Sequence, residues 1–224
     1  MDEIDKIKER YKSRQTAEIK SKYAQGNTYS KNIVKERELL YASVLTNKFA
    51  KIEDIKLLEI GAGEGLNLNG FMSLGIPKEN ITINELLEDR VVVLKQNYPD
   101  IKAYSGNALD IPSSEQFDVV FQSTVFTSIL DKALKQQIAN KMLELVKPNG
   151  IILWYDFVYD NPNNKDVKGV SKQEIRQLFA KASKITIKKV TLAPPIGRRV
   201  GNLYGILNGL FPFLRSHVVA VIEK

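Results

Sequence analysis

The sequence predicts an α/β fold with a doubly wound sheet of seven mostly parallel strands and an antiparallel last strand. Two observations support this prediction. From residue 55 onward, short apolar segments alternate with segments of helical periodicity, which is typical of βαβ units with right-handed crossovers. In addition, the apolar segment that ends at Ile60 runs into three alternating glycines, Gly61, Gly63 and Gly65. Such a turn brings backbone N–H groups close to a ligand at the start of a helix.

The alternation sets the order of the elements. We expect strands at residues 56–60, 80–85, 101–105, 117–122, 150–156, 185–192 and 217–223. Helices are expected between them at residues 66–73, 87–97, 131–146 and 172–182. Before the sheet, residues 1–25 have helical periodicity, with a thin apolar stripe of Ile4, Ile7 and Tyr11. Gly26 and Asn27 are expected to break this helix, and a second helix is expected at residues 32–49. We therefore divide one structural domain into an N-terminal helical lid region, 1–50, and a region that contains the sheet, 51–224.

Composition limits the class of protein. The chain has 224 residues, 43% of them hydrophobic and 26% charged, which are ordinary globular values. Because it has no cysteine, disulfides, thiolate metal sites and cysteine nucleophiles are excluded, and a reducing cytoplasm fits. We expect no leader peptide and no membrane span, since no stretch reaches about 18 apolar residues.

The net charge of +7 is unevenly distributed. Residues 165–199 carry ten Lys and Arg against two acids. Such a segment is either a solvated surface or an attraction for phosphate or nucleic acid. Two functional alternatives follow: an RNA-directed enzyme or RNA-binding protein, and a protein at a membrane surface through residues 201–214. Nucleic acid is the less favoured partner, because the sequence has no appended RNA-binding module.

The glycine turn reads Leu-Leu-Glu-Ile-Gly-Ala-Gly-Glu-Gly over residues 57–65. Leu66 stands where a dinucleotide fingerprint would have its third glycine, so the spacing is E-x-G-x-G-x-G. This resembles motif I of the class I S-adenosylmethionine-dependent methyltransferases, which have a Rossmann-like fold. The resemblance implies S-adenosylmethionine as the cofactor, held by Glu59, Gly61, Ala62 and Gly63. An acidic residue beside the turn suits the ammonium group of that ligand.

Later strand ends fit the same resemblance. Glu85 ends the second strand about 20 residues after the turn, where a carboxylate can accept ribose hydroxyls, with Asn84 beside it; the plainer alternative for Glu85 is a charge at the start of the next helix. Where the family usually has Gly-Asp-Ala, this chain has Gly-Asn-Ala, so we expect Asn107, Ala108 and Leu109 to meet the adenine through weaker bonds. Gln122 and Phe126 are expected to flank the methionine portion and the adenine face, although Phe126 also fits plain core.

A narrower resemblance concerns the acceptor. Residues 122–125 lack the Asp/Asn-Pro-Pro-aromatic motif of enzymes that methylate exocyclic amines of nucleobases. Residues 121–130, 152–157, 160–164, 190–199 and 214–223 are instead similar to a bacterial small-molecule methyltransferase subfamily associated with surface polysaccharides such as O-antigen and capsule. The resemblance implies an acceptor that is a sugar or a phosphorylated or nucleotide-linked sugar.

The acceptor residues are predicted from position. Tyr155, Asp156 and Asn161 lie at and above the end of the fifth strand, where Asp156 is a weak candidate for a general base. Arg198 and Arg199 are candidates for binding a phosphate. Turn chemistry and surface solvation are the alternatives for these residues.

His217 is the only histidine and a second weak catalytic candidate, but it starts the last strand, so a structural role is favoured. We expect no metal site. Nothing in the sequence indicates an oligomeric state.

Overall fold

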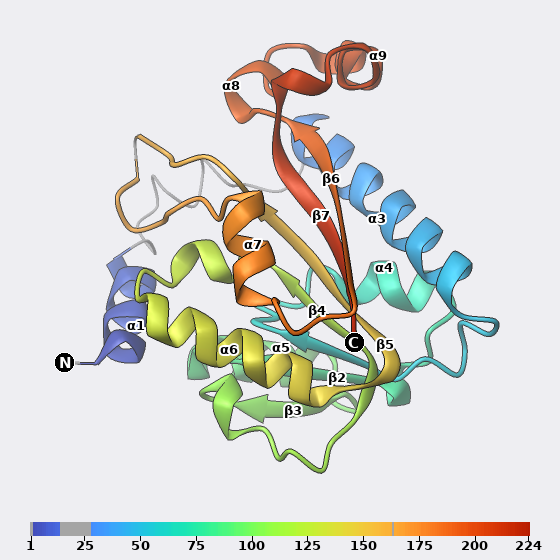
Figure 1. Ribbon diagram of the computed structural model, residues 1–224, viewed down its shortest axis with the longest axis vertical. Coiled ribbons are helices and arrows are strands. Elements are labelled where there is room, and N and C mark those ends of the chain that lie inside the picture. Colours follow the sequence, from blue (N-terminus) through green and yellow to red (C-terminus); the bar gives the residue numbers. More distant parts are fainter. Residues whose placement is uncertain (1, 14–27, 163) are drawn as a thin grey trace.

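The computed structural model describes residues 2–13, 28–162 and 164–224. Its centre is a seven-stranded sheet with the order β3-β2-β1-β4-β5-β7-β6 (Figure 1). The strands are β1 Leu57–Ile60, β2 Ile81–Glu85, β3 Lys102–Ser105, β4 Phe117–Ser123, β5 Val146–Phe157, β6 Lys184–Leu192 and β7 Arg215–Glu223. Strands β1 to β5 pair in parallel, and β7 is antiparallel to both β5 and β6. The predicted fold class is confirmed.

Helices cover both faces of the sheet (Figure 1). One apolar cluster joins a face of the sheet to α3 Thr28–Lys48, α4 Leu68–Ser73 and α5 Glu88–Asn97. The other cluster joins the opposite face to α1 Glu3–Ser13, α6 Lys132–Leu145 and α7 Lys172–Leu178. Because both faces are covered, all four residues of β1 are buried, including the charged Glu59.

Short elements complete the fold. Single turns are η1 Lys78–Asn80, η2 Ala108–Asp110 and η3 Phe126–Ser128. Between β6 and β7 the chain forms α8 Pro194–Gly197, η4 Gly201–Leu203, α9 Tyr204–Leu210 and η5 Pro212–Leu214. Figure 1 shows α8 and α9 carried on the ends of β6 and β7, beyond the helices that cover the sheet.

Three element boundaries differ from the sequence prediction by four residues. Strand β5 starts at Val146, four residues early, because Val146 pairs with Phe117 before a register shift, and Asn149 has a left-handed φ of 65°. Helix α7 stops at Leu178, since Phe179 turns into the core against Trp154. Helix α3 begins at Thr28 instead of residue 32. Residues 14–25 of the predicted first helix, with Gly26 and Asn27, lie outside the described residues.

The lid role of residues 1–50 stays a prediction. The two described helices of this region, α1 and α3, pack on opposite faces of the sheet. Among the helices of the described chain, none is both long and apolar enough to cross a lipid bilayer.

Candidate active site

A cavity of about 470 Å³ opens at the carboxyl ends of β1, β2 and β4. The strand order reverses around β1, which pairs with β2 on one side and with β4 on the other, and ligands of doubly wound sheets bind at such a switch point. The lining residues come from the helices α1, α3, α5 and α6, the glycine turn, the ends of β1, β2 and β4, the loop after β3, and η3. Residues from both predicted regions of the chain therefore meet here.

The three glycines of the turn all have left-handed backbones, with φ of 68° at Gly61, 62° at Gly63 and 84° at Gly65. A Cβ on Gly61 would meet Val125 Cγ2 at 2.5 Å, and one on Gly65 would meet Tyr98 and Leu94 at 2.8 and 2.9 Å. At Gly63 the nearest atom would be Arg90 Nη1 at 4.0 Å. The outer two glycines thus permit close packing, whereas Gly63 leaves open space on the cavity side.

Glu85 holds the turn in place from the end of β2. Its Oε2 accepts a hydrogen bond from the N–H of Gly63 at 2.7 Å, and its Oε1 accepts one from the N–H of Leu87 at 2.9 Å. Only 4% of the residue is exposed, and burial raises the pKa of its carboxyl. Gly106, with φ of 99°, leaves a second open space on the same cavity wall.

A buried charged cluster underlies the other end of the turn. Glu59 is fully buried, and its Oε1 accepts from Asn67 Nδ2 at 2.7 Å, while its Oε2 has no hydrogen-bond partner among the described residues. Burial raises the pKa of Glu59 to about 8, which Asn67 and the Arg37 charge partly oppose. Arg37 Nη1 donates to Ser123 Oγ at 3.2 Å, but its buried Nε has no partner in this same set. Buried polar groups without partners are rare, so the cluster has unused capacity for a polar ligand.

Helix α1 borders the cavity from the opposite face of the sheet to α3. Its apolar stripe of Ile4, Ile7 and Tyr11 lines the cavity, and the Arg90 guanidinium lies 4.7 Å from the centre of the Tyr11 ring.

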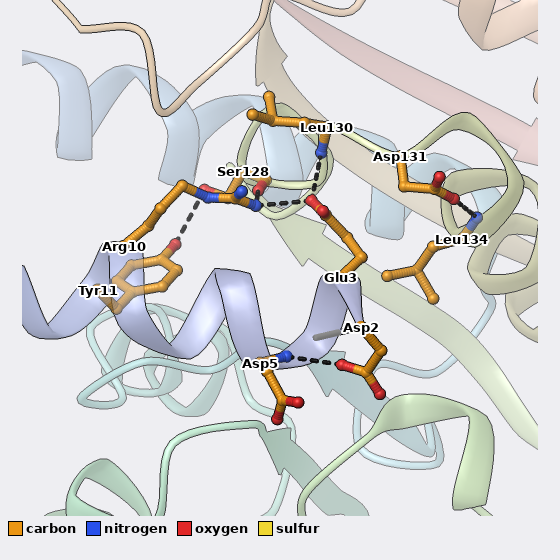
Figure 2. A network of polar contacts seen from close by, with 9 residues as sticks. All are labelled: Asp2, Glu3, Asp5, Arg10, Tyr11, Ser128, Leu130, Asp131 and Leu134. Atoms are coloured by element: carbon orange, nitrogen blue, oxygen red, sulfur yellow. Dashed lines mark hydrogen bonds and ion pairs between the residues drawn. The ribbon is translucent and has the colours of Figure 1, made fainter.

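Figure 2 shows how polar contacts hold α1 on the loop after β4. Arg10 donates to Glu3 at 2.7 Å and to the carbonyl of Ser128 at 3.1 Å, and Glu3 also accepts from the N–H of Leu130 at 3.0 Å. The Tyr11 hydroxyl lies 3.0 Å from Ser128 Oγ. The helix is therefore held at both ends of its inner face.

Most predicted cofactor residues gather in this cavity. Its lining includes Gly61, Ala62, Gly63, Asn84, Glu85, Asn107 and Ala108. Asn84 Nδ2 donates to the carbonyls of Tyr104 and Gly106, and Asn107 Oδ1 accepts from the N–H of Leu109, which caps η2. An amide oxygen accepts two bonds, so Asn107 retains one for a ligand.

Three predicted cofactor residues do not line the cavity: Glu59, Leu109 and Gln122. The Gln122 side chain donates to the carbonyl of Tyr155 at 3.3 Å and accepts from the N–H of Val125 at 3.0 Å, which fixes the turn after β4. Phe126 is fully buried against Trp154, as core.

The predicted acceptor residues lie outside the cavity lining. Asp156 is fully buried and accepts from Thr127 Oγ1 at 2.8 Å and from the N–H of Phe157 at 3.0 Å; burial raises its pKa to about 7. Tyr155 is also buried, with its hydroxyl 3.1 Å from Thr191 Oγ1. These contacts favour structural roles for both residues.

The remaining acceptor candidates also lie outside the cavity lining. Asn161 and the exposed Arg198 and Arg199 belong to loops and a short helix that contribute no lining residue. His217 is half-buried and stacks on Tyr155 with ring centres 5.2 Å apart, and burial lowers its pKa to about 4. The assigned roles of these residues stay predictions without support from the cavity geometry.

Several lining residues were not predicted as site residues from the sequence. Arg90, Ser123, Thr124 and Ser128 lie on the cavity, and Arg37 of the predicted lid region joins them. One signal was available: Ser123 and Thr124 follow the end of the predicted fourth strand, where ligands bind. Arg90 and Arg37 lie on helices of mixed charge, in which they do not stand out.

Comparisons with known proteins agree with this site. Residues 57–150 match the family model described as a methyltransferase domain. Magnesium protoporphyrin IX methyltransferase (ChlM) from Synechocystis PCC 6803, solved with bound S-adenosylmethionine, is 12% identical, with a TM-score of 0.65 over 100% of this chain and 98% of that chain. CalS10, an amino pentose methyltransferase from Micromonospora echinaspora, is 12% identical, with a TM-score of 0.57 over 84% and 90%.

A third similar structure is a SAM-dependent methyltransferase from Archaeoglobus fulgidus, 15% identical, with a TM-score of 0.58 over 85% of this chain and 96% of that chain. A comparison with curated protein sequences found no significant match.

Residues 57–150, which match a methyltransferase domain, run from β1 into β5 and contain the glycine turn, and the sheet as a whole has the fold of the similar methyltransferase structures. The protein is a class I methyltransferase that uses S-adenosylmethionine.

Proposed function

We propose that this enzyme methylates an oxygen or nitrogen of a small-molecule acceptor, namely a sugar or a phosphorylated or nucleotide-linked sugar used for a surface polysaccharide. The observation that carries the proposal is the chemistry of the cavity wall after β4. Ser123, Thr124 and Ser128 bring hydroxyl groups to it, and Arg37 brings a cation. Hydroxyls suit sugar hydroxyls, and a guanidinium suits a phosphate or carboxylate.

Of the similar structures, CalS10 supports a sugar acceptor, whereas ChlM supports only the broader class of small-molecule acceptors. CalS10 is described as an amino pentose methyltransferase and ChlM as a magnesium protoporphyrin IX methyltransferase, and both are similar in fold to this chain. We place the reaction in the cytoplasm, in keeping with a chain that has no cysteine.

We assign the nucleoside end of the cofactor to the wall between Gly63 and Asn107. The open spaces at Gly63 and Gly106 allow a ligand to approach the backbone closely. Glu85 accepts ribose hydroxyls there, and Asn107 with the N–H groups after it meets the adenine. The residues present therefore fit the group.

The amino-acid end fits the buried charged cluster. Arg37 binds the carboxylate, because its Nε has no partner among the described residues and its Nη1 already reaches Ser123 on the cavity wall. Glu59 lies behind Asn67, which lines the cavity, and burial raises the pKa of Glu59 to about 8. An ammonium group bound beside it favours the loss of this proton, so that Glu59 then provides the matching negative charge. One cation and one buried carboxyl thus complement the two charges of an amino acid.

S-adenosylmethionine supplies an electrophilic methyl group on a sulfonium, and the protein positions the acceptor in line with it. Holding two reactants in a near-attack geometry accounts for about 7–11 kcal/mol of a barrier. Asp156 and His217 do not line the cavity. We therefore assign catalysis here to positioning and to the exclusion of water by α1.

The first experiment is calorimetric titration with S-adenosylmethionine and S-adenosylhomocysteine. We expect micromolar binding to the wild type, weakening of about tenfold or more in Glu85→Ala, and little change in Glu64→Ala, a matched carboxylate at the cavity rim. Absence of binding by a folded wild type would overturn the cofactor assignment.

The second experiment uses radiolabelled methyl donor with nucleotide-linked sugars, sugar phosphates and total RNA as acceptors. Label in a sugar compound supports the proposal. Label in RNA alone would replace it with the RNA-directed alternative.

A further inference from the structure

The segment between β6 and β7, residues 193–214, forms a protruding unit that we call the β6–β7 insert. It contains α8, η4, α9 and η5. Because β7 is antiparallel to both β5 and β6, β6 runs in the direction of β5. The insert therefore lies at the same edge of the sheet as the cavity, and Figure 1 shows it at one end of the molecule.

The outer surface of the insert is apolar. Leu203, Ile206 and Leu210 follow helical spacing along η4 and α9, and they are 57%, 59% and 68% exposed. Phe211 and Phe213, in the following turn, are 37% and 71% exposed. Five large apolar side chains within eleven consecutive residues form the kind of exposed patch that marks an interaction surface.

The charge of this part of the chain is of one sign. Residues 175–222 contain eight Lys and Arg and no Asp or Glu. Two of these cations, Arg198 and Arg199, are exposed on the insert itself. An exposed apolar stripe beside cations, in a segment of chain that has no acid of its own, suits a lipid surface with an apolar interior and anionic headgroups.

We propose that the β6–β7 insert docks on the surface of an anionic lipid bilayer. Leu203, Ile206, Leu210 and the two phenylalanines enter the boundary between headgroups and acyl chains, while Arg198 and Arg199 face anionic headgroups. Amphipathic interfacial segments bind through this combination of buried apolar area and electrostatic attraction. The proposal concerns the location of the enzyme and does not depend on which acceptor the cavity takes.

Two other occupants fit less well. A symmetric contact with a second copy of the chain would place the same basic surface on itself, and no acid in residues 175–222 would offset the repulsion. Nucleic acid requires stacking platforms, whereas three of the five exposed side chains are aliphatic.

The insert is held firmly, which limits the entropy lost on docking. Glu36 of α3 accepts four hydrogen bonds: from Tyr204 Oη at 2.7 Å, Asn208 Nδ2 at 2.6 Å, and the N–H and Oγ1 of Thr191 at 3.1 Å each. Behind α9, the rings of Tyr29 and Tyr204 pack edge to face, and together with Leu192 they form a small core of their own. The apolar stripe is thus presented by a supported helix.

The test is co-sedimentation of the full chain with vesicles of phosphatidylcholine, with and without phosphatidylglycerol. We expect binding to the anionic vesicles that weakens with added salt and is much lower on pure phosphatidylcholine. The double variant Leu210→Ser, Phe213→Ser should lose at least about tenfold in affinity. Arg198→Gln with Arg199→Gln should lose roughly fivefold for each arginine on anionic vesicles. The matched control is Val92→Ser with Lys95→Gln on the exposed face of α5, which should bind as the wild type does.

Binding of S-adenosylmethionine, measured on every variant, separates loss of docking from loss of the fold or of the cofactor site. The proposal is overturned if a cofactor-binding wild type does not sediment with anionic vesicles, or if the insert variants bind them as well as the control does. Light scattering that shows a dimer dissociated by Leu210→Ser, Phe213→Ser would assign the patch to a second copy. Binding of RNA that these variants abolish would assign it to nucleic acid.

Discussion

The two halves of the sheet present their strand ends to the cavity in different ways. In the half formed by β1 to β4, the residues after β1 and β3 and the end of β2 line the cavity. Gly63 and Gly106 expose their backbone there, and Glu85 contributes a carboxyl group. In the half formed by β5 to β7, the side chains at the strand ends bond within the protein, as Asp156 does with Thr127 and Tyr155 with Thr191.

The difference teaches that a buried strand end is not by itself a binding site. Around β1, the order of the strands reverses and leaves a crevice. At the end of β5, η3 and the chain after it cover the strand, so that Asp156 is fully buried. The four predictions below test whether the ligand chemistry belongs to the first half alone.

The largest effect is expected at Gly63. Gly63→Val adds a side chain where the cavity is open, at a φ of 62°, and should weaken S-adenosylmethionine at least about a hundredfold, or about 2.7 kcal/mol. Gly75→Val is the control, since Gly75 also has a left-handed φ of 109° but lies in an exposed turn away from the cavity. Titration calorimetry and thermal unfolding of both variants compare binding with stability. Equal losses of affinity in the two would remove Gly63 from the site.

A smaller and more selective effect is expected at Arg37. Arg37→Met should weaken S-adenosylmethionine about tenfold to a hundredfold, because a charge-assisted bond to the carboxylate is lost. It should leave the affinity for 5′-methylthioadenosine, which has no amino-acid portion, nearly unchanged. Lys35→Met, an exposed residue of the same helix, is the control. An equal loss for both ligands would show that Arg37 acts on the fold of the site instead of on the carboxylate.

A moderate effect on stability is expected at Glu59. Burial raises its pKa from 4.5 to about 8, so between these pH values the folded protein keeps a proton that the unfolded chain has lost. The contribution of this residue to the free energy of unfolding is therefore present below pH 4.5 and is lost as the pH rises to about 8. Urea unfolding across this range should show a flatter pH profile for Glu59→Gln than for the wild type, and Glu79→Gln, on the surface, should follow the wild type. A Glu59→Gln profile as steep as that of the wild type would contradict the assignment.

The smallest effect is expected at His217. It lies outside the cavity lining and its pKa is lowered to about 4, so it does not change charge near neutral pH. His217→Gln should keep methyl transfer within about twofold and leave its pH profile unmoved above pH 6. A profile that loses an ionisation in this variant would restore His217 as a base and extend the chemistry to the second half of the sheet.

The sequence predicted the fold well because its signals were local and repeated. Alternating apolar and amphipathic segments fixed the element order, and Gly61, Gly63 and Gly65 located the switch point. The boundaries that were missed depend on contacts distant in sequence, such as the pairing of Val146 with Phe117 and the packing of Phe179 on Trp154.

The candidate site was predicted unevenly for a related reason. The role of a glycine in a tight turn can be predicted from its residue type and spacing alone. The direction of a side chain depends on its neighbours in the folded structure, which the sequence does not list. Gln122 stands at a strand end as expected, but it bonds to Tyr155 and Val125 and turns away from the cavity. Arg37 is one of many cations in the sequence, and only the tertiary structure brings it to Ser123.

Two adjacent residues of α3 bond to different parts of the molecule, one to the β6–β7 insert and the other to the cavity wall. Glu36 gathers the four donors that hold α9 and the end of β6, while Arg37 reaches Ser123 on the cavity wall. Neighbouring residues on a helix are about 100° apart around its axis, so a turn of α3 that shifts one side chain shifts the other as well. If docking of the insert favours one rotation of α3, the affinity of the cavity for its ligand changes with it. By thermodynamic linkage, ligand binding in the cavity then changes the docking affinity by the same factor. Helix α3 thus couples the free energy of docking at the β6–β7 insert to the free energy of ligand binding in the cavity.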